Sequence, residues 1–178
     1  MTELRVFSHG ALEGIPAYVY IGLIVTFCIG SILLLWLKEW RKGIRYCAFL
    51  LLAEWIFLVF CTCVFFRESG EECRVNLIPL ISYFDYGENS YLMEKAALNI
   101  LNVALFIPVG LLSGYGFRKI TWQRVLCIGA LLSIIVEILQ LILRRGLCEM
   151  DDVIHNIVGG MVGYGVYWIF KYLHMKLN

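Results

Sequence analysis

The stretch that decides the fold of this chain is EILQLILRRGLCEMDDVIHNIVGGMVG, residues 137–163. It holds the end of one apolar run, a short polar turn and the start of another apolar run, which predicts two membrane helices with a tight connection. An ionisable group at bilayer depth costs about 2.5–3.5 kcal/mol on insertion scales, so polar residues concentrated here indicate a site or a buried network. These residues are Glu137, Gln140, Arg144, Arg145, Glu149, Asp151, Asp152, His155 and Asn156.

The composition of the whole chain agrees with a membrane location. Of its 178 residues, 61% are apolar, whereas soluble domains contain about 45–50% apolar residues. The net charge of +1 and the lack of a basic tail do not fit a nucleic-acid-binding protein, so we expect no nucleic-acid partner. The sequence predicts one membrane domain, residues 1–178, of the all-α class: a polytopic helix bundle.

Five apolar runs are predicted to cross the membrane, since about 20 apolar residues span its hydrocarbon core. Glu54 stands alone within the second run, and the sequence identifies no partner for it. A further segment, Val75–Phe84, is too short to span and is predicted to be an interfacial or re-entrant piece of the second external loop. This segment either covers the candidate site formed by the polar residues from outside, or it lies on the surface of the protein. The five runs are Ala17–Leu37, Tyr46–Phe66, Ala96–Phe117, Val125–Leu143 and Val153–Phe170.

The distribution of Lys and Arg predicts the orientation of these spans, because cytoplasmic loops carry an excess of both. The loops around residues 38–45 and 118–124 and the C-terminal tail together hold more Lys and Arg than the opposite side. The chain is therefore predicted to be a multi-pass protein of the cell membrane, with its N-terminus outside and its C-terminus in the cytoplasm.

With that topology, three predicted helices place polar groups near their outer ends. Each of these helices has a stripe of residues at spacings of three and four that can face a common interior, in the fifth span Asp152, Asn156, Gly159 and Gly163. Gly159 and Gly163 form a small-xxx-small pair, which allows a neighbouring backbone to approach closely. The polar groups are Asn99 and Asn102 in the third span, Glu137 and Gln140 in the fourth, and Asp152, His155 and Asn156 in the fifth.

A set of short motifs resembles the VanZ-like family of membrane proteins. The motifs occur in the expected order over about residues 75–167, and the first two spans match only in hydrophobicity. The chain is identified as a member of this family, with a VanZ-like core at residues 75–170. The motifs are NLIPL (76–80), NVALFIPVG (102–110), SIIVEILQ (133–140), RG (145–146) and EMDDVIHNIVGG (149–160).

The resemblance implies an integral membrane protein of the cell envelope. The family is named for a protein linked to teicoplanin resistance, so the resemblance also suggests protection against glycopeptide antibiotics. It carries over no settled biochemical activity, and whether this chain is an enzyme stays open.

The first functional hypothesis is a binding site for an amphipathic envelope ligand at the outer leaflet. Arg144 or Arg145 would contact an anionic head group, and amides would contact sugar or peptide groups. The expected partner is a membrane lipid, a lipid-linked envelope precursor or a lipoglycopeptide antibiotic such as teicoplanin. The candidate ligand-binding residues are Asn76, Asn99, Asn102, Glu137, Gln140, Arg144, Arg145, Glu149, Asp151, Asp152 and Asn156.

The alternative hypothesis is an intramembrane enzyme that acts on a lipid-linked envelope substrate. Glu137, Asp152 and His155 are its candidate catalytic residues, since each can serve as an acid or a base. Asp152 and Asn156 share one helix face while Asp151 and His155 share another, so we expect no metal site, and we expect no cofactor. A transporter or channel would be favoured by an inverted repeat, which the sequence lacks.

Three questions stay open at this level. The first is whether the polar side chains form a binding or catalytic site or only hydrogen-bond between helices, which is common in membrane bundles. Cys73 and Cys148 are predicted to lie close together in outer loops, where a disulfide can form in an oxidising compartment. The sequence does not indicate the oligomeric state.

Overall fold

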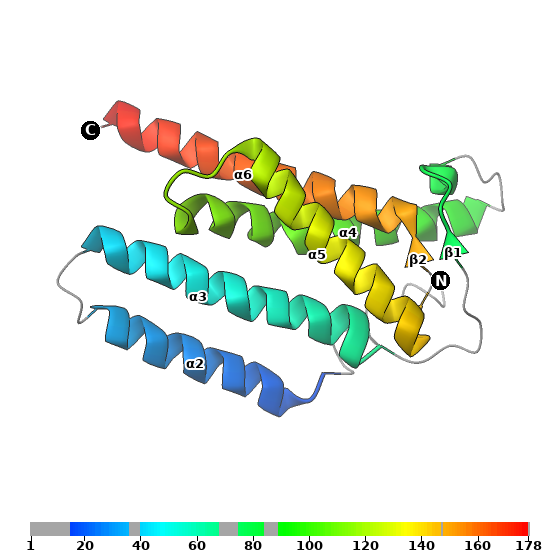
Figure 1. The fold of residues 1–178 in the computed structure, drawn as a ribbon, viewed down its shortest axis with the longest axis horizontal. Coiled ribbons are helices and arrows are strands. Elements are labelled where there is room, and N and C mark those ends of the chain that lie inside the picture. Colours follow the sequence, from blue (N-terminus) through cyan, green and yellow to red (C-terminus); the bar gives the residue numbers. More distant parts are fainter. Residues whose placement is uncertain (1–14, 36–39, 68–74, 84–88, 147, 178) are drawn as a thin grey trace.

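The computed structural model describes residues 15–35, 40–67, 75–83, 89–146 and 148–177. Long helices account for most of these residues, so the protein is the all-α bundle that the sequence predicts (Figure 1). A five-residue π-helix, η1 (Cys61–Phe65), extends the second long helix, and a 3₁₀ turn, η2 (Ile81–Tyr83), lies before the third. The long helices are α2 (Ala17–Leu35), α3 (Trp40–Phe60), α4 (Asn89–Gly116), α5 (Trp122–Leu143) and α6 (Met150–Leu177).

Four segments of the described chain are long and apolar enough to cross a membrane, namely Lys42–Phe65, Lys95–Gly116, Trp122–Leu143 and Met150–Leu177. The first predicted span corresponds to α2, in which the apolar segment Ala17–Gly30 is shorter. Large apolar side chains face outward along the bundle, and polar side chains lie inside it. A bundle in lipid has this arrangement, because the surrounding solvent is apolar and buried polar groups must find partners inside. The chain is a membrane protein.

Several helices extend beyond their apolar runs. Helix α4 begins at Asn89, seven residues before the predicted span Ala96–Phe117, and it ends at Gly116. The predicted span Val153–Phe170 lies within α6, which ends at Leu177. Hydrophobicity identifies only the part of a helix that matches lipid. The polar turns at either end keep their backbone hydrogen bonds without contributing to that signal.

Helices α4 and α6 form the centre of the bundle, and three glycines bring their backbones together. A Cβ atom added to Gly159 would lie 2.1 Å from the carbonyl oxygen of Val103, and one on Gly163 would lie 1.9 Å from that of Ile107. A Cβ atom on Gly110 would lie 1.8 Å from the carbonyl oxygen of Gly160. The small-xxx-small pair predicted on α6 is therefore a close helix contact.

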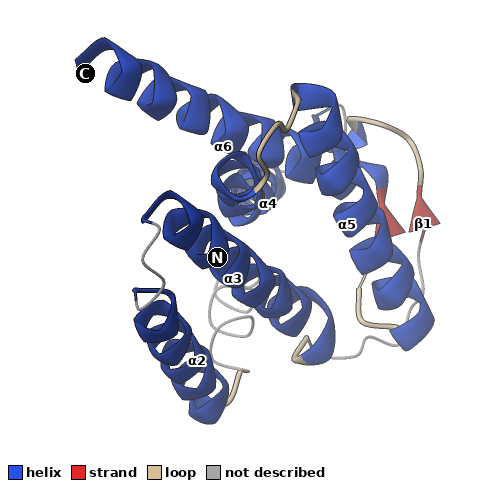
Figure 2. Ribbon diagram, turned by 60° about the vertical axis from the view of Figure 1, so that its left-hand side comes forward, coloured by secondary structure: helices blue, strands red, loops and turns tan. Residues whose placement is uncertain are grey.

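Helix α3 packs against α4 through an apolar core, and α2 lies beside α3 at the edge of the bundle (Figure 2). The indole Nε1 of Trp55 donates a 2.8 Å hydrogen bond to the carbonyl oxygen of Leu105, which ties α3 to α4. Glu54 accepts a 2.8 Å hydrogen bond from Thr26 Oγ1 on α2, so the structure supplies the partner that the sequence did not identify. The buried apolar core comprises Leu52, Val59, Val64, Phe106, Val109 and Val136.

Candidate functional site

The polar residues meet where α5 ends and α6 begins. Between these helices the chain reverses at Arg144, which has a left-handed backbone with φ of 53°, and at Gly146, with φ of 149°. It then enters β2 (Cys148–Glu149), which pairs in parallel with β1 (Val75–Asn76). The register aligns Val75 with Cys148 and Asn76 with Glu149. This short pairing fixes the loop before α4 against the turn before α6 (Figure 1).

We call the group of side chains at this end of the bundle the polar cluster. Its members come from α4, α5, β2 and α6. Most are buried even though they carry charges or amides, and Ser133, Glu137, Gln140 and Asn156 are each at most 4% exposed. The polar cluster comprises Asn102, Ser133, Glu137, Gln140, Glu149, Asp152 and Asn156.

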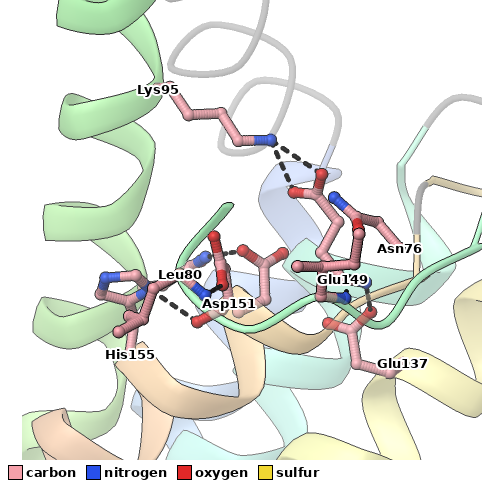
Figure 3. Close-up of polar contacts among 10 residues, drawn as sticks. Asn76, Leu80, Lys95, Glu137, Glu149, Asp151 and His155 are labelled. Carbon is pink, nitrogen blue, oxygen red and sulfur yellow. Dashed lines mark hydrogen bonds and ion pairs between the residues drawn. The ribbon is translucent and has the colours of Figure 1, made fainter. Parts of the chain in front are cut away.

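Glu137 is held by the strand that precedes α6. The backbone N–H of Glu149 donates to Glu137 Oε2 at 3.1 Å, and Lys95 Nζ donates to the two carboxylate oxygens of Glu149 at 2.8 and 2.7 Å (Figure 3). The side chains of Lys95 and Glu149 are 15% and 13% exposed. The ion pair is thus partly shielded from solvent, and it links α4 to β2.

Two amides connect α6 to its neighbours. Asn102 Nδ2 on α4 donates to Asp152 Oδ1 at 2.8 Å, and Asn156 Nδ2 donates to Ser133 Oγ on α5 at 2.8 Å. Asp152 and Asn156 lie one helical turn apart, so one face of α6 contacts α4 near its start and α5 one turn later.

Gln140 joins α5 to the end of α3. Its Nε2 donates to the backbone oxygen of Cys63 at 2.9 Å. A carbonyl oxygen only accepts, so this contact fixes the amide with its nitrogen toward η1. The amide oxygen then faces away, and in the described part of the chain Gln140 Oε1 and Asn156 Oδ1 are buried without a hydrogen-bond donor.

The two neighbouring arginines differ in their surroundings. Arg145 donates to the backbone oxygens of Val64, Phe65 and Arg67, with distances of 3.2 Å to Val64 and 3.1 Å to Arg67. A cation suits the end of a helix, because the last carbonyl groups there lack partners. Arg144 is exposed. Of the two arginines expected to contact an anionic head group, Arg145 is therefore occupied with the end of α3.

The segment before α4 lies against the start of α6. The backbone N–H of Leu80 donates to Asp151 Oδ1, and Tyr83 forms a 2.7 Å hydrogen bond with His155 Nε2. His155 Nδ1 donates to the carbonyl oxygen of Asp151 at 2.5 Å, because a carbonyl oxygen only accepts. Asp151 and His155 thus position this segment beside the polar cluster (Figure 3).

The remaining predicted residues lie around this arrangement. Asn76 accepts a 3.3 Å hydrogen bond from the backbone N–H of Ile78, which shapes the turn that follows β1. Asn99 is buried on α4, at 4% exposure. Cys73 lies outside the described residues, so its proximity to Cys148 stays a prediction. No group of three or more His, Cys, Asp or Glu side chains among the described residues is placed to hold a metal ion.

Three residues that contribute to this arrangement are not among those predicted from the sequence: Arg67, Tyr83 and Lys95. Lys95 lies four residues before Asn99 and seven before Asn102, so the same helical stripe contained the signal that would have found it. Arg67 interacts electrostatically with Glu137 and Asp152, and a Cβ atom on Gly146 would lie 2.8 Å from its Cζ. Tyr83 is part of the predicted segment Val75–Phe84 but is not singled out by it, and no pattern indicates Arg67, which lies in the connection between α3 and α4.

The polar cluster is rich in acceptors. Glu137 and Asp152 contribute carboxyl groups, and Gln140 and Asn156 contribute the two amide oxygens without donors. Of the nearby cations, Lys95 pairs with Glu149, Arg145 donates to backbone oxygens, and Arg67 interacts electrostatically with Glu137 and Asp152. The chemistry of the cluster therefore suits a group with several O–H or N–H donors better than it suits an anion.

Comparison with known proteins gives one family. The family described as VanZ/LLP1 matches residues 47–171, more than half of the chain, and the match includes the predicted core and most of α3. Protein VanZ of Enterococcus faecium is 32% identical over 104 residues. That alignment covers 54% of this chain and 65% of the relative, so it spans less than two thirds of the relative's length. No solved structure matches the chain. The chain belongs to the VanZ/LLP1 family.

Proposed function

We propose that the polar cluster binds the donor-rich polar head of an amphipathic envelope molecule, whose apolar tail lies along the lipid-facing helices. The observation that carries this proposal is the pair of buried amide oxygens, Gln140 Oε1 and Asn156 Oδ1, that lack donors. A buried polar atom without a partner costs about 1–3 kcal/mol, so such atoms favour a ligand or an ordered water that supplies the donor. Sugar hydroxyls and peptide N–H groups are donors of this kind.

Two classes of molecule combine such a head with an apolar tail. One is a lipid-linked envelope precursor, and the other is an acylated glycopeptide such as teicoplanin. The motifs that resemble the VanZ-like family support the second class, because that resemblance suggests protection against glycopeptide antibiotics. We propose that binding at the polar cluster contributes to glycopeptide resistance.

The proposal includes an orientation for the bundle. The excess of Lys and Arg near residues 38–45, near residues 118–124 and in the C-terminal tail favours the cytoplasm for that end. The N-terminus is then outside, the C-terminus is cytoplasmic, and the polar cluster lies at the outer leaflet. Envelope precursors and glycopeptides both reach that leaflet.

The test is a binding measurement on the purified full chain in lipid nanodiscs. Teicoplanin, its deacylated core and a lipid-linked peptidoglycan precursor are titrated against wild type and against Glu137→Gln and Asp152→Asn. Loss of a hydrogen bond to a charged group costs about 1.5–3 kcal/mol, so the Kd of each variant should rise about 10- to 100-fold.

The matched control is Glu54→Gln, which removes a half-buried carboxylate that accepts a hydrogen bond from Thr26 on α2, outside the polar cluster. Its affinity should stay within about twofold of wild type. The proposal is wrong if wild type binds neither class of ligand, or if folded Glu137→Gln and Asp152→Asn bind as wild type does.

A second candidate is an intramembrane enzyme that acts on a lipid-linked substrate. It is favoured by the electrostatic interaction between two carboxyl groups, Glu137 and Asp152, in one buried site. Such a pair can divide the roles of acid and base. Turnover of the lipid-linked precursor by pure protein, with loss of turnover in Glu137→Gln at unchanged Kd, would favour the enzyme over the binder.

A further inference from the structure

A cavity of about 640 Å³ lies at the end of the bundle opposite the polar cluster. It opens between the start of α3, the end of α4 and the last turns of α6, which is the end of α6 marked C in Figure 1. Its volume falls within the range of about 300–1,000 Å³ that is typical of small-molecule sites. Neither the family match nor the chemistry of the polar cluster accounts for it.

The ionisable side chains that line the described part of the cavity are basic, apart from the tyrosines. Arg45 comes from α3, Arg118 follows α4, and Lys171 and His174 come from α6. None of the described residues that line the cavity is acidic. Two guanidinium groups and an ammonium group that face one space attract an anion, and a guanidinium matches the geometry of a phosphate especially well.

The wall of the cavity is aromatic and closely packed. A Cβ atom on Gly114 would lie 2.3 Å from Cγ of Tyr167, so the glycine makes room for that ring against α4. The ring of Tyr115 meets the ring of Tyr167 edge to face, with centroids 5.0 Å apart. Lys171 Nζ lies 4.5 Å from the centroid of the Trp168 ring. This cation–π contact holds the ammonium group beside the cavity.

The surroundings point to a lipid. Tyr and Trp together with Lys and Arg at the ends of membrane helices are typical of the headgroup layer. Apolar side chains that line the same cavity are exposed, including Ile44 at 45%, Phe117 at 41% and Phe170 at 55%. They supply an apolar surface along which acyl chains would lie. The cavity therefore has cations for a lipid phosphate next to an apolar surface for the acyl chains of the same lipid.

We propose that this basic-aromatic cavity binds the headgroup phosphate of an anionic phospholipid from the bilayer leaflet at that end. Arg45 and Arg118 contact the phosphate, Lys171 adds positive charge beside it, and the acyl chains run outward past Phe117 and Phe170. The site is independent of the ligand bound at the polar cluster. It gives the bundle a fixed lipid partner at its other end.

The experiment is native mass spectrometry of the full chain in a detergent that retains bound lipid. Phosphatidylglycerol and phosphatidylcholine of equal chain length are titrated separately, and inorganic phosphate is then added as a competitor. Phosphatidylglycerol should bind about tenfold more tightly than phosphatidylcholine. The double variant R45Q/K171Q should lose that preference, and R118Q alone should reduce it.

The control is R124Q/K176Q, which removes the same charge at the same end of the bundle from residues that do not line the cavity. It should keep the preference of wild type. Equal binding of the two lipids by wild type would overturn the proposal, and so would equal losses in R45Q/K171Q and R124Q/K176Q. Displacement of phosphatidylglycerol by inorganic phosphate at equal concentration would also overturn it, since the site would then recognise a free anion.

Discussion

Replacement of Gly159 by alanine should weaken the central helix pair, and replacement of its neighbour Gly160 should not. An alanine Cβ at position 159 would lie 2.1 Å from the carbonyl oxygen of Val103, whereas a Cβ at position 160 would meet nothing within 4 Å. Real Cβ atoms essentially never approach another atom closer than 3.0 Å. Helix α6 must therefore retreat from α4 by roughly 1 Å, which loosens the packing on either side.

The size of the effect follows from that displacement. Overpacking of a close contact costs about 1–3 kcal/mol. For a chain of this length each kcal/mol lowers the melting temperature by about 2–4 °C, so Gly159→Ala should melt roughly 2–12 °C below wild type. Gly160→Ala adds the same methyl group to the same helix without a clash, and its melting temperature should not fall.

The assay is thermal unfolding of the protein purified in detergent. Samples are heated to a series of temperatures, and size-exclusion chromatography measures the folded fraction that remains. Both variants differ from wild type by one methyl group, so their expression and detergent binding should be comparable. Equal melting temperatures for Gly159→Ala and Gly160→Ala would refute the argument that the glycine contact holds α4 and α6 together.

Two further predictions concern the neighbouring arginine pair and the orientation of the bundle. Arg145→Gln should lower stability by about 1.5–3 kcal/mol, because three backbone oxygens at the end of α3 lose a charged donor, whereas exposed Arg144→Gln should melt as wild type does. If the two variants melt alike, Arg145 does not hold the end of α3. A cysteine introduced at Lys119 in a variant lacking the native cysteines should resist an impermeant thiol reagent in intact cells; labelling from outside would reverse the proposed orientation.

The sequence predicted the helices well because a membrane bundle shows its spans directly as apolar runs. It also indicated which faces meet, since Asn102, Glu137 and Asp152 lie on regular helical stripes. The contacts among the polar cluster follow these stripes. Lys95 belongs to the same stripe as Asn102, so its place in the site was within reach of the same reasoning.

Other parts of the site were beyond sequence reasoning. The pairing of β1 with β2 joins two-residue strands that are distant in the sequence, and strands so short have no periodicity to detect. From the sequence, Arg144 or Arg145 is expected to contact a ligand, because a guanidinium suits anions. In the structure Arg145 faces backbone carbonyls of η1, a π-helix that no pattern indicated. The role of an arginine depends on its nearest acceptors, which only the three-dimensional arrangement reveals.

The glycine contacts between α4 and α6 also limit how this protein can move. Val103 and Ile107 are four residues apart, as are Gly159 and Gly163, so two successive turns of the helices interlock at matching heights. A lengthwise displacement of α6 by one helical turn would bring His155 opposite the Val103 oxygen or Tyr167 opposite the Ile107 oxygen, where even a Cβ atom lacks room. Sliding is thereby blocked while tilting about the contact stays possible. In the function that we propose, a large head group would therefore reach Asn102 and Asp152 by a splaying of the helix ends.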